Sequence, residues 1–144
     1  MQDYKQLFKI GEKLNDDGFC AVIALCTVLD ISFKRAKRKL EKLGRKHRKG
    51  TPTRYTLKAL SNHGFKTVRL EHYLGRKYRD AGITANQAQN RYNKGTYLVT
   101  FHGSIDHIAC LKDGKYNDWI DKQYRGTAPK FEVCEIYQVT KKEK

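Results

Sequence analysis

The segment "CAVIALCTVLDI", residues 20–31, constrains the fold of this 144-residue chain most, because it is apolar on nearly every side. A surface helix carries an apolar stripe opposite a polar face, whereas a helix without a polar face has to be buried. The segment is also shorter than the roughly 20 apolar residues that a membrane-spanning helix needs. The sequence therefore predicts a buried helix at the centre of a soluble domain.

The polar turn "NDDGF" precedes this helix and places Cys20 at its first position. A thiol is a good nucleophile only as a thiolate, and the unpaired N–H groups and the dipole at a helix start favour that form. The same N–H groups can stabilise an oxyanion on an attacked carbonyl, and Asn15 is the nearest upstream amide that could assist. Cysteine is also among the most buried residue types, so packing is the alternative interpretation of Cys20.

Helical and strand patterns occupy different parts of the chain. Besides the buried helix, apolar spacing predicts helices over 33–43, 54–63 and 84–92. Strands are predicted over 65–70, 96–102, 106–112, 115–121 and 131–139. We expect an α+β fold in which N-terminal helices, including the buried central one, pack on a C-terminal antiparallel sheet. A single domain is expected over residues 1–140, with a disordered basic tail over 141–144.

A predicted hairpin brings a histidine and a carboxylate together. Asp113-Gly114 is typical of a two-residue hairpin turn between the strands 106–112 and 115–121. In that register His107 and Asp118 are diagonal neighbours on one face, at roughly 7–8 Å between their backbones, whereas Asp121 falls on the other face. Because a nucleophilic thiol needs a base that a carboxylate or amide orients, His107 and Asp118 are the candidate base and orienting group.

Three stretches carry a resemblance to a known family: "NDDGFCAVIALCTVLDISFKRAKRKLEKLGR", "LKALSNHGFKTV" and "GTYLVTFHGSIDHIACLKDGKYNDWID". They resemble small bacteriophage peptidase-like proteins, which have the papain-like fold and are related to the bacteriocin-leader-processing peptidase domains. The resemblance implies that Cys20 is the nucleophile, His107 the base and Asp118 the orienter. The chain departs from the family pattern at residues 17–19, which separate the Asn-Asp pair from the cysteine, and no glutamine stands at the usual upstream oxyanion position.

Positive charge is concentrated in one segment. Ten of the thirty Lys and Arg residues lie within 34–49, and the formal net charge of the chain is +15. This concentration favours an anionic partner, either nucleic acid or an acidic host protein, although a merely solvated helix face is the alternative. The residues predicted to contact a polyanion are Lys34, Arg35, Lys37, Arg38, Lys39, Arg45, Lys46 and Arg48.

The remaining features narrow the class of protein. The four cysteines show no C-x-x-C spacing, so we expect neither a metal site, nor a cofactor, nor a disulfide scaffold. The chain shows no signal-like start, so we expect a cytoplasmic protein without membrane contacts, in the host cytoplasm if it is phage-encoded.

Two functions stay open. One is a phage-like cysteine hydrolase that cleaves a peptide or isopeptide bond in a peptide or protein substrate. The other is a catalytically vestigial papain-fold protein whose basic helix binds nucleic acid or an acidic host protein.

Overall fold

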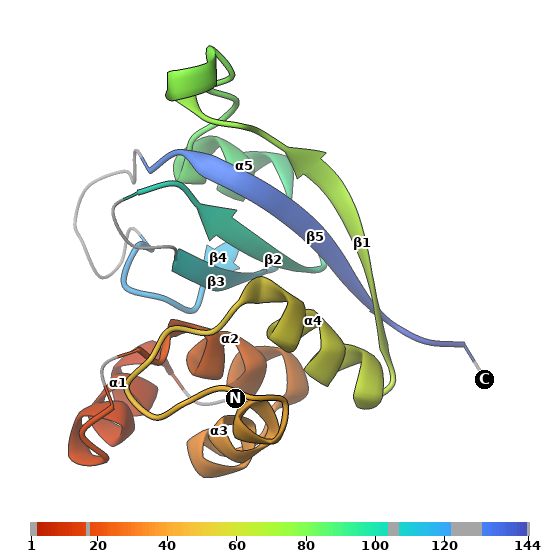
Figure 1. Ribbon diagram of the computed structural model, residues 1–144. Helices are drawn as coiled ribbons and strands as arrows, with labels where there is room; N and C mark the ends of the chain where they lie inside the picture. Colours follow the sequence, from red (N-terminus) through yellow and green to blue (C-terminus); the bar gives the residue numbers. More distant parts are fainter. Residues whose placement is uncertain (1–2, 17, 104–106, 122–130, 144) are drawn as a thin grey trace. The chain divides into compact units, whose positions relative to one another are not determined.

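The computed structural model describes residues 3–16, 18–103, 107–121 and 131–143 (Figure 1). The chain forms two compact units, the first comprising residues 1–67 and 140–144 and the second residues 68–139. Four α-helices lie in the first unit and most residues of the sheet lie in the second, so the expected α+β class is confirmed. None of the helices in the described ranges is long and apolar enough to cross a membrane.

Four helices belong to the first unit. Their bounds are α1 Tyr4–Lys13, α2 Cys20–Leu29, α3 Phe33–Lys42 and α4 Thr53–Asn62. The last three match the predicted helices to within about two residues, the usual scatter of helix ends. Helix α1 was not predicted, although Asp3 and Gln6 form a capping box at its start, with each side chain bonded to the other residue's backbone.

Helix α2 is buried along its length, as its uniform apolar character predicts, and it packs against α1, α3 and α4. The turn before it is held by Phe19, whose ring centroid lies 5.4 Å from that of Phe8 and 5.7 Å from that of Phe33. Gly11 in α1 makes room for this ring, because a Cβ atom there would come within 2.7 Å of it. This aromatic packing fixes the point at which α2 begins, at Cys20.

Five strands pair into one sheet in the order β1-β5-β2-β3-β4. Their bounds are β1 Phe65–His72, β2 Thr96–Phe101, β3 His107–Lys112, β4 Lys115–Tyr116 and β5 Val133–Lys141. The pairs β2–β3, β2–β5 and β3–β4 are antiparallel. A short 3-10 helix, Arg76–Tyr78, and the predicted helix, α5 Ala85–Arg91, lie between β1 and β2 in the chain. Asp106, the first residue of one predicted strand, lies outside the described residues.

The hairpin has the predicted register but a shorter second strand. Lys112 pairs with Lys115 across the Asp113-Gly114 turn, as expected for a two-residue loop. However, β4 ends at Tyr116, so the prediction of a strand over 115–121 is wrong beyond that residue.

Two carboxylates explain why the strand ends early. Asp118 accepts a hydrogen bond from the backbone N–H of Ile120 at 3.2 Å, and Asp121 accepts one from the backbone N–H of Tyr116 at 2.8 Å. The N–H of Asp121 also donates to the carbonyl of Asp118 at 3.1 Å, which closes a turn. Such local bonds give the backbone an alternative to strand pairing.

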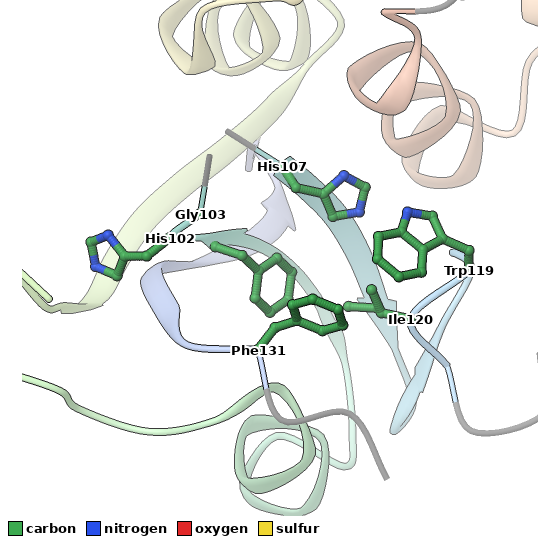
Figure 2. Close-up of a pocket in the computed structure, with 7 residues that line it drawn as sticks. His102, Gly103, His107, Trp119, Ile120 and Phe131 are labelled. Carbon is green, nitrogen blue, oxygen red and sulfur yellow. The ribbon is translucent and has the colours of Figure 1, made fainter. Parts of the chain in front are cut away.

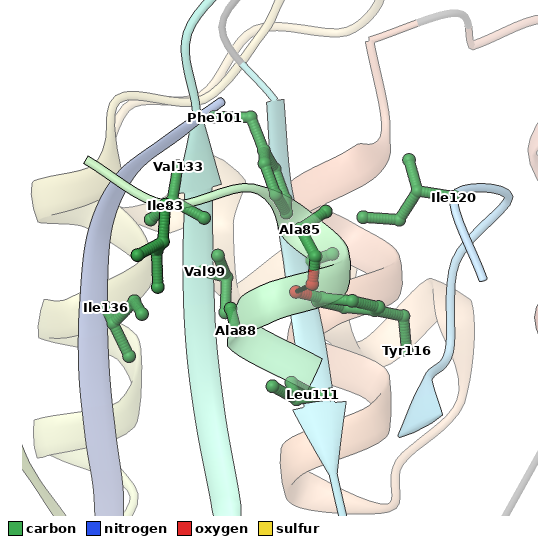
Figure 3. Packing of buried hydrophobic residues seen from close by; sticks show 11 residues of the cluster. Ile83, Ala85, Ala88, Val99, Phe101, Leu111, Tyr116, Ile120, Val133 and Ile136 are labelled. Carbon is green, nitrogen blue, oxygen red and sulfur yellow. Dashed lines mark hydrogen bonds between the residues drawn. The ribbon is translucent and has the colours of Figure 1, made fainter. Parts of the chain in front are cut away.

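Helix α5 covers one face of the sheet in the second unit (Figure 3). Ala85 and Ala88 are fully buried against that face, and their small side chains allow the helix to approach the strands closely. The hydroxyl of Tyr116 donates to the carbonyl of Ala85 at 2.8 Å. This core holds the neighbouring ends of β2 and β3, where Phe101 pairs with His107.

The C-terminal residues continue the sheet further than expected. The predicted disordered tail, 141–144, begins inside β5, because Lys141 is the last residue of that strand. The backbone N–H of Lys142 donates to the carbonyl of Gly64 at 2.9 Å, and its ammonium group donates to Ser61. Lys144 lies outside the described residues.

Candidate active site

His107 and Asp118 form a hydrogen-bonded pair in the second unit. His107 begins β3 and is partly buried, whereas Asp118 is 1% exposed. The Nε2 atom of His107 lies 2.9 Å from Oδ2 of Asp118, and the same oxygen accepts the N–H of Ile120. The pairing that the hairpin register predicts from the sequence is therefore present, although a turn and not a strand positions the carboxylate.

This contact determines how the imidazole can act. A carboxylate accepts the proton that Nε2 carries, so the neutral ring has its proton on Nε2 and its lone pair on Nδ1. Asp118 is buried beside the ring, and the negative charge of its carboxylate stabilises the imidazolium that forms when Nδ1 takes up a proton. The pair thus has the arrangement of a histidine base with an orienting carboxylate.

Asp121 has a different role from its neighbour. Its Oδ2 atom accepts hydrogen bonds from the backbone of Tyr116 at 2.8 Å and from Nε2 of Gln89 at 3.1 Å. These contacts attach the turn to β4 and α5, and the residue is 4% exposed. Asp121 therefore supports the turn that carries Asp118.

A cavity of about 340 Å³ opens beside His107 (Figure 2). Its lining includes Phe101, His102, His107, Trp119, Ile120 and Phe131. The centroid of the Trp119 ring lies 5.5 Å from that of His107 and 5.2 Å from that of Phe131, which it meets edge to face. Sequence patterns do not predict this cavity, because its described residues come from several separate segments between 101 and 131 and share no motif.

Cys20 is the first residue of α2 and is partly buried. The N-cap residue of this helix, Phe19, makes no side-chain cap bond, and the first backbone bond of the helix runs from the N–H of Ile23 to the carbonyl of Phe19. N–H groups in the first turn of a helix have no partner within the helix and favour a negative charge nearby. Cys20 belongs to the first unit and the His107–Asp118 pair to the second.

Asn15, the predicted oxyanion donor, lies in the turn after α1. Its backbone is left-handed, with φ of 56°, and its side chain is exposed. It lines a second cavity of about 340 Å³, within the first unit, together with Phe8, Glu12, Asp16 and Phe19. Cys20 is not among the residues that line this cavity.

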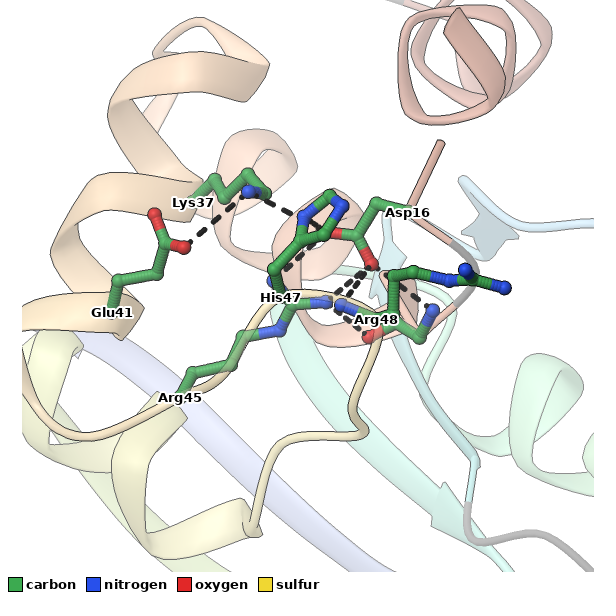
Figure 4. Close-up of polar contacts among 7 residues, drawn as sticks. Asp16, Lys37, Glu41, Arg45, His47 and Arg48 are labelled. Atoms are coloured by element: carbon green, nitrogen blue, oxygen red, sulfur yellow. Dashed lines mark hydrogen bonds and ion pairs between the residues drawn. The ribbon is translucent and has the colours of Figure 1, made fainter. Parts of the chain in front are cut away.

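The turn before Cys20 is held by a buried ion pair (Figure 4). Arg45 donates to the carboxylate of Asp16 from Nη1 at 3.0 Å and from Nη2 at 2.8 Å, and Nη2 also donates to the carbonyl of Gly18 at 2.7 Å. The backbone N–H groups of Gly18 and Arg48 donate to the same carboxylate at 3.2 Å. Because Gly18 lies two residues before Cys20, this network fixes the entry into α2.

The surroundings of Asp16 favour its ionised form. Burial by itself raises the pKa of the carboxyl group. The hydrogen bond from Arg45, the backbone N–H of Gly18 and the positive charges of Arg45 and Lys37 outweigh burial, so the pKa of Asp16 lies below its ordinary value.

The structure removes two residues, Arg45 and Lys37, from the predicted polyanion surface. The side chain of Arg45 is 0% exposed and is bonded to Asp16, so it cannot reach an external polyanion. Lys37 is mostly buried and pairs with Glu41 at 3.3 Å. The remaining predicted residues, which we call the basic surface, are exposed apart from the partly exposed Lys39: Lys34, Arg35, Arg38, Lys39, Lys46 and Arg48.

The other cysteines differ from Cys20 in burial or setting. Cys26 and Cys110 are buried, and burial raises the pKa of both thiols to about 12. Cys134 is partly buried on β5. Within the described ranges, no three His, Cys, Asp or Glu side chains are grouped so that they could bind a metal ion.

Comparisons of the chain with protein-family models, with curated proteins and with solved structures gave no match.

Proposed function

We propose that this protein is a cysteine hydrolase of the papain-like type, which cleaves a peptide or isopeptide bond with Cys20, His107 and Asp118. The observation that carries the proposal is the 2.9 Å contact between Nε2 of His107 and the buried carboxylate of Asp118. This contact leaves Nδ1 as the basic nitrogen of the neutral ring. The position of Cys20 as the first residue of α2 supports the proposal from the other unit.

The proposed reaction has two halves. Nδ1 of His107 takes the proton from the Cys20 thiol, and the thiolate attacks the carbonyl carbon of the substrate. The N–H groups at the start of α2 stabilise the oxyanion, and His107 then gives its proton to the leaving amine. Water, activated by the same imidazole, hydrolyses the acyl-enzyme and restores the thiol.

Alkylation kinetics test the proposal without a known substrate. Wild-type protein and the His107→Gln variant are treated with iodoacetamide at pH 6, and mass spectrometry follows each cysteine separately. If His107 activates Cys20, the variant should alkylate at Cys20 at least about tenfold more slowly, while Cys134 reacts at the same rate in both proteins. Equal Cys20 rates in the two proteins contradict the proposal.

A second candidate function is nucleic-acid binding through the basic surface, with the hydrolase site vestigial. The distribution of charge favours it: residues 1–67 and 140–144 hold nineteen of the thirty Lys and Arg and seven of the fifteen Asp and Glu. The first unit thus has a formal charge of +12 and the second of +3. Phosphate contacts by clustered Lys and Arg account for most sequence-independent binding to nucleic acid.

A further inference from the structure

Four of the seven described residues that line the cavity beside His107 are apolar, and three of these carry aromatic rings. The rings of Trp119 and Phe131 lie close to Ile120 in Figure 2, and Phe101 is the fourth apolar residue of the lining. Trp119 is 37% exposed, so one wall of the cavity faces solvent. A volume of about 340 Å³ is at the lower end of the range for small-molecule pockets, which suits a single side chain better than a larger ligand.

The charges at the cavity exclude some occupants. No carboxylate lines the cavity among the described residues, and its titratable groups are His102 and His107. Nε2 of His102 lies 2.7 Å from the carbonyl oxygen of Tyr73, which orients that ring. A cationic side chain would find no carboxylate among these described residues to pair with, and taking an unpaired charge out of water is costly, so this lining favours an uncharged group. Aromatic walls that meet edge to face favour an aromatic ring over an aliphatic one.

We infer that this cavity binds an uncharged aromatic side chain of the substrate, next to the bond that is cleaved. The inference rests on the proposed function, because the cavity adjoins the imidazole that we propose as the base. A substrate residue in the cavity contacts the His107 ring, so the bond that follows or precedes this residue lies close to Nδ1. The cavity would therefore select substrates with phenylalanine or a similar residue at the cleavage point.

The intrinsic fluorescence of Trp119 tests this inference directly, because Trp119 is the one tryptophan in the chain. The protein is titrated with N-acetylphenylalaninamide, with N-acetylglycinamide and with the cation phenethylammonium. We expect a saturable change in emission with the first compound, and at least about tenfold weaker binding of the other two. Equal binding of phenethylammonium or of N-acetylglycinamide overturns the inference, as does the absence of any saturable change with N-acetylphenylalaninamide.

Variants locate the bound compound. Phe131→Ala should weaken binding of N-acetylphenylalaninamide at least about tenfold, and Phe131→Leu, which preserves more of the packing, should weaken it less. Tyr78→Ala removes an exposed aromatic ring of the same unit that does not line the cavity, and it should leave binding unchanged. If Phe131→Ala and Phe131→Leu are folded by circular dichroism and bind as wild type does, the compound lies elsewhere and the inference is wrong.

Hydrolysis assays separate this inference from the proposed function. A peptide mixture is incubated with the protein, and mass spectrometry records the residues that flank each cleaved bond. Cleavage without enrichment of aromatic residues contradicts the inference and leaves the hydrolase proposal in place. The other outcome is that N-acetylphenylalaninamide binds saturably, but Cys20 is alkylated at the same rate in wild type and in His107→Gln. That outcome contradicts the hydrolase proposal and leaves the aromatic pocket in place.

Discussion

His107 and Asp118 are joined by a 2.9 Å hydrogen bond, although strand pairing between their two segments ends at Tyr116. The turn at Asp118 closes through its own carboxylate, which accepts the N–H of Ile120 and the imidazole Nε2 at one oxygen. The carboxylate that orients the histidine is thus itself fixed by the backbone. The imidazole is therefore positioned without any bound ligand, which the proposed acid–base catalysis requires.

Removal of the Asp118 carboxylate should therefore disable the proposed base. Asp118→Ala deprives Nε2 of its acceptor, so the ring loses its fixed tautomer, and we expect hydrolysis to fall by about a hundredfold or more. Asp118→Asn keeps an oxygen that can accept the Nε2 proton and should lose less. The tautomer is measured by nitrogen NMR of the imidazole, and the rate by Cys20 alkylation at pH 6.

Asp121→Asn is the matched control for this pair. Asp121 follows the same hairpin and is equally buried, but it bonds to Tyr116 and Gln89 and not to His107. Its asparagine variant should lose some stability and keep the wild-type tautomer of His107. A loss of Cys20 reactivity as large as in Asp118→Ala would show that the contacts of Asp118 are structural only.

The sequence predicts the His107–Asp118 contact through the hairpin register, even though the strand expected to carry Asp118 ends two residues before it. The two-residue turn sets the pairing register, and so decides which side chains of the two strands share a face of the sheet. This alternation holds as far as Tyr116, where β4 ends. Beyond Tyr116 one more backbone bond, from the N–H of Asn117 to the carbonyl of Cys110, holds the chain to β3, and the path then depends on the bonds between the carboxylates and the backbone. These bonds join residues two to five positions apart, but aspartate forms them in some settings and not in others, so the pattern of residue types does not show that they end the strand here.

Cysteine reactivity should separate Cys20 from the two buried thiols. Burial raises the pKa of Cys26 and Cys110 to about 12, so both stay protonated at pH 8 and should resist iodoacetamide in the folded protein. Both should react once urea unfolds the chain. Alkylation at Cys26 or Cys110 as fast as at Cys20 in the folded protein would contradict this description of the core.

Replacement of Cys20 by serine tests its role without a large change in packing. A serine fits a helix start, so Cys20→Ser should keep the circular dichroism spectrum and the melting temperature of wild type. It should abolish hydrolysis, because a hydroxyl does not form the required nucleophile beside this base. Unchanged turnover by Cys20→Ser would end the hydrolase proposal.

The Asp16–Arg45 pair should contribute strongly to stability. Asp16→Asn leaves the guanidinium of Arg45 buried without its charge partner, which costs about 3–5 kcal/mol of the free energy of unfolding. Chemical denaturation at pH 7 measures this loss. Glu41→Gln removes the partner of Lys37 at a more exposed position, and it should cost less than about 1 kcal/mol.

The lowered pKa of Asp16 predicts how the stability of the fold depends on pH. The native pKa of Asp16 lies below its unfolded value of about 3.9. The carboxylate therefore stabilises the fold fully above that unfolded value, and its contribution disappears as the pH falls through the native pKa. Denaturation midpoints measured from pH 5 down to pH 2 should fall more steeply for wild type than for Asp16→Asn. Parallel curves would show that Asp16 titrates alike in both states.

The sequence shows that residues 34–49 are strongly basic, but it does not show which of these basic side chains are buried and which are exposed. A buried arginine needs an anionic partner, and Glu41 is the one acid within that segment. The partner of Arg45 comes from Asp16, 29 residues away, and no local pattern predicts such a pairing. Helix α1 shows the opposite case, because the capping residues Asp3 and Gln6 mark its start in the sequence.

Binding to duplex DNA should depend on the basic surface and on salt. Replacing Lys34, Arg35 and Arg38 together by glutamine removes three exposed positive charges from α3. If each contacts a phosphate, the slope of log affinity against log salt should decrease in magnitude by up to about 0.9 per residue. Fluorescence anisotropy of a short labelled duplex, titrated at several KCl concentrations, measures this slope.

The matched control removes three exposed lysines from the second unit, Lys94, Lys112 and Lys115, also by substitution with glutamine. Both triple variants have the same formal net charge, so only the position of the lost charges differs. The control should bind the duplex with the salt slope of wild type, because long-range attraction alone is largely screened beyond about 10 Å at 0.1 M salt. Equal loss of affinity in the two variants would show that net charge, and not the basic surface, attracts the duplex. Tighter binding of polyglutamate than of the duplex would instead indicate an acidic protein as the partner.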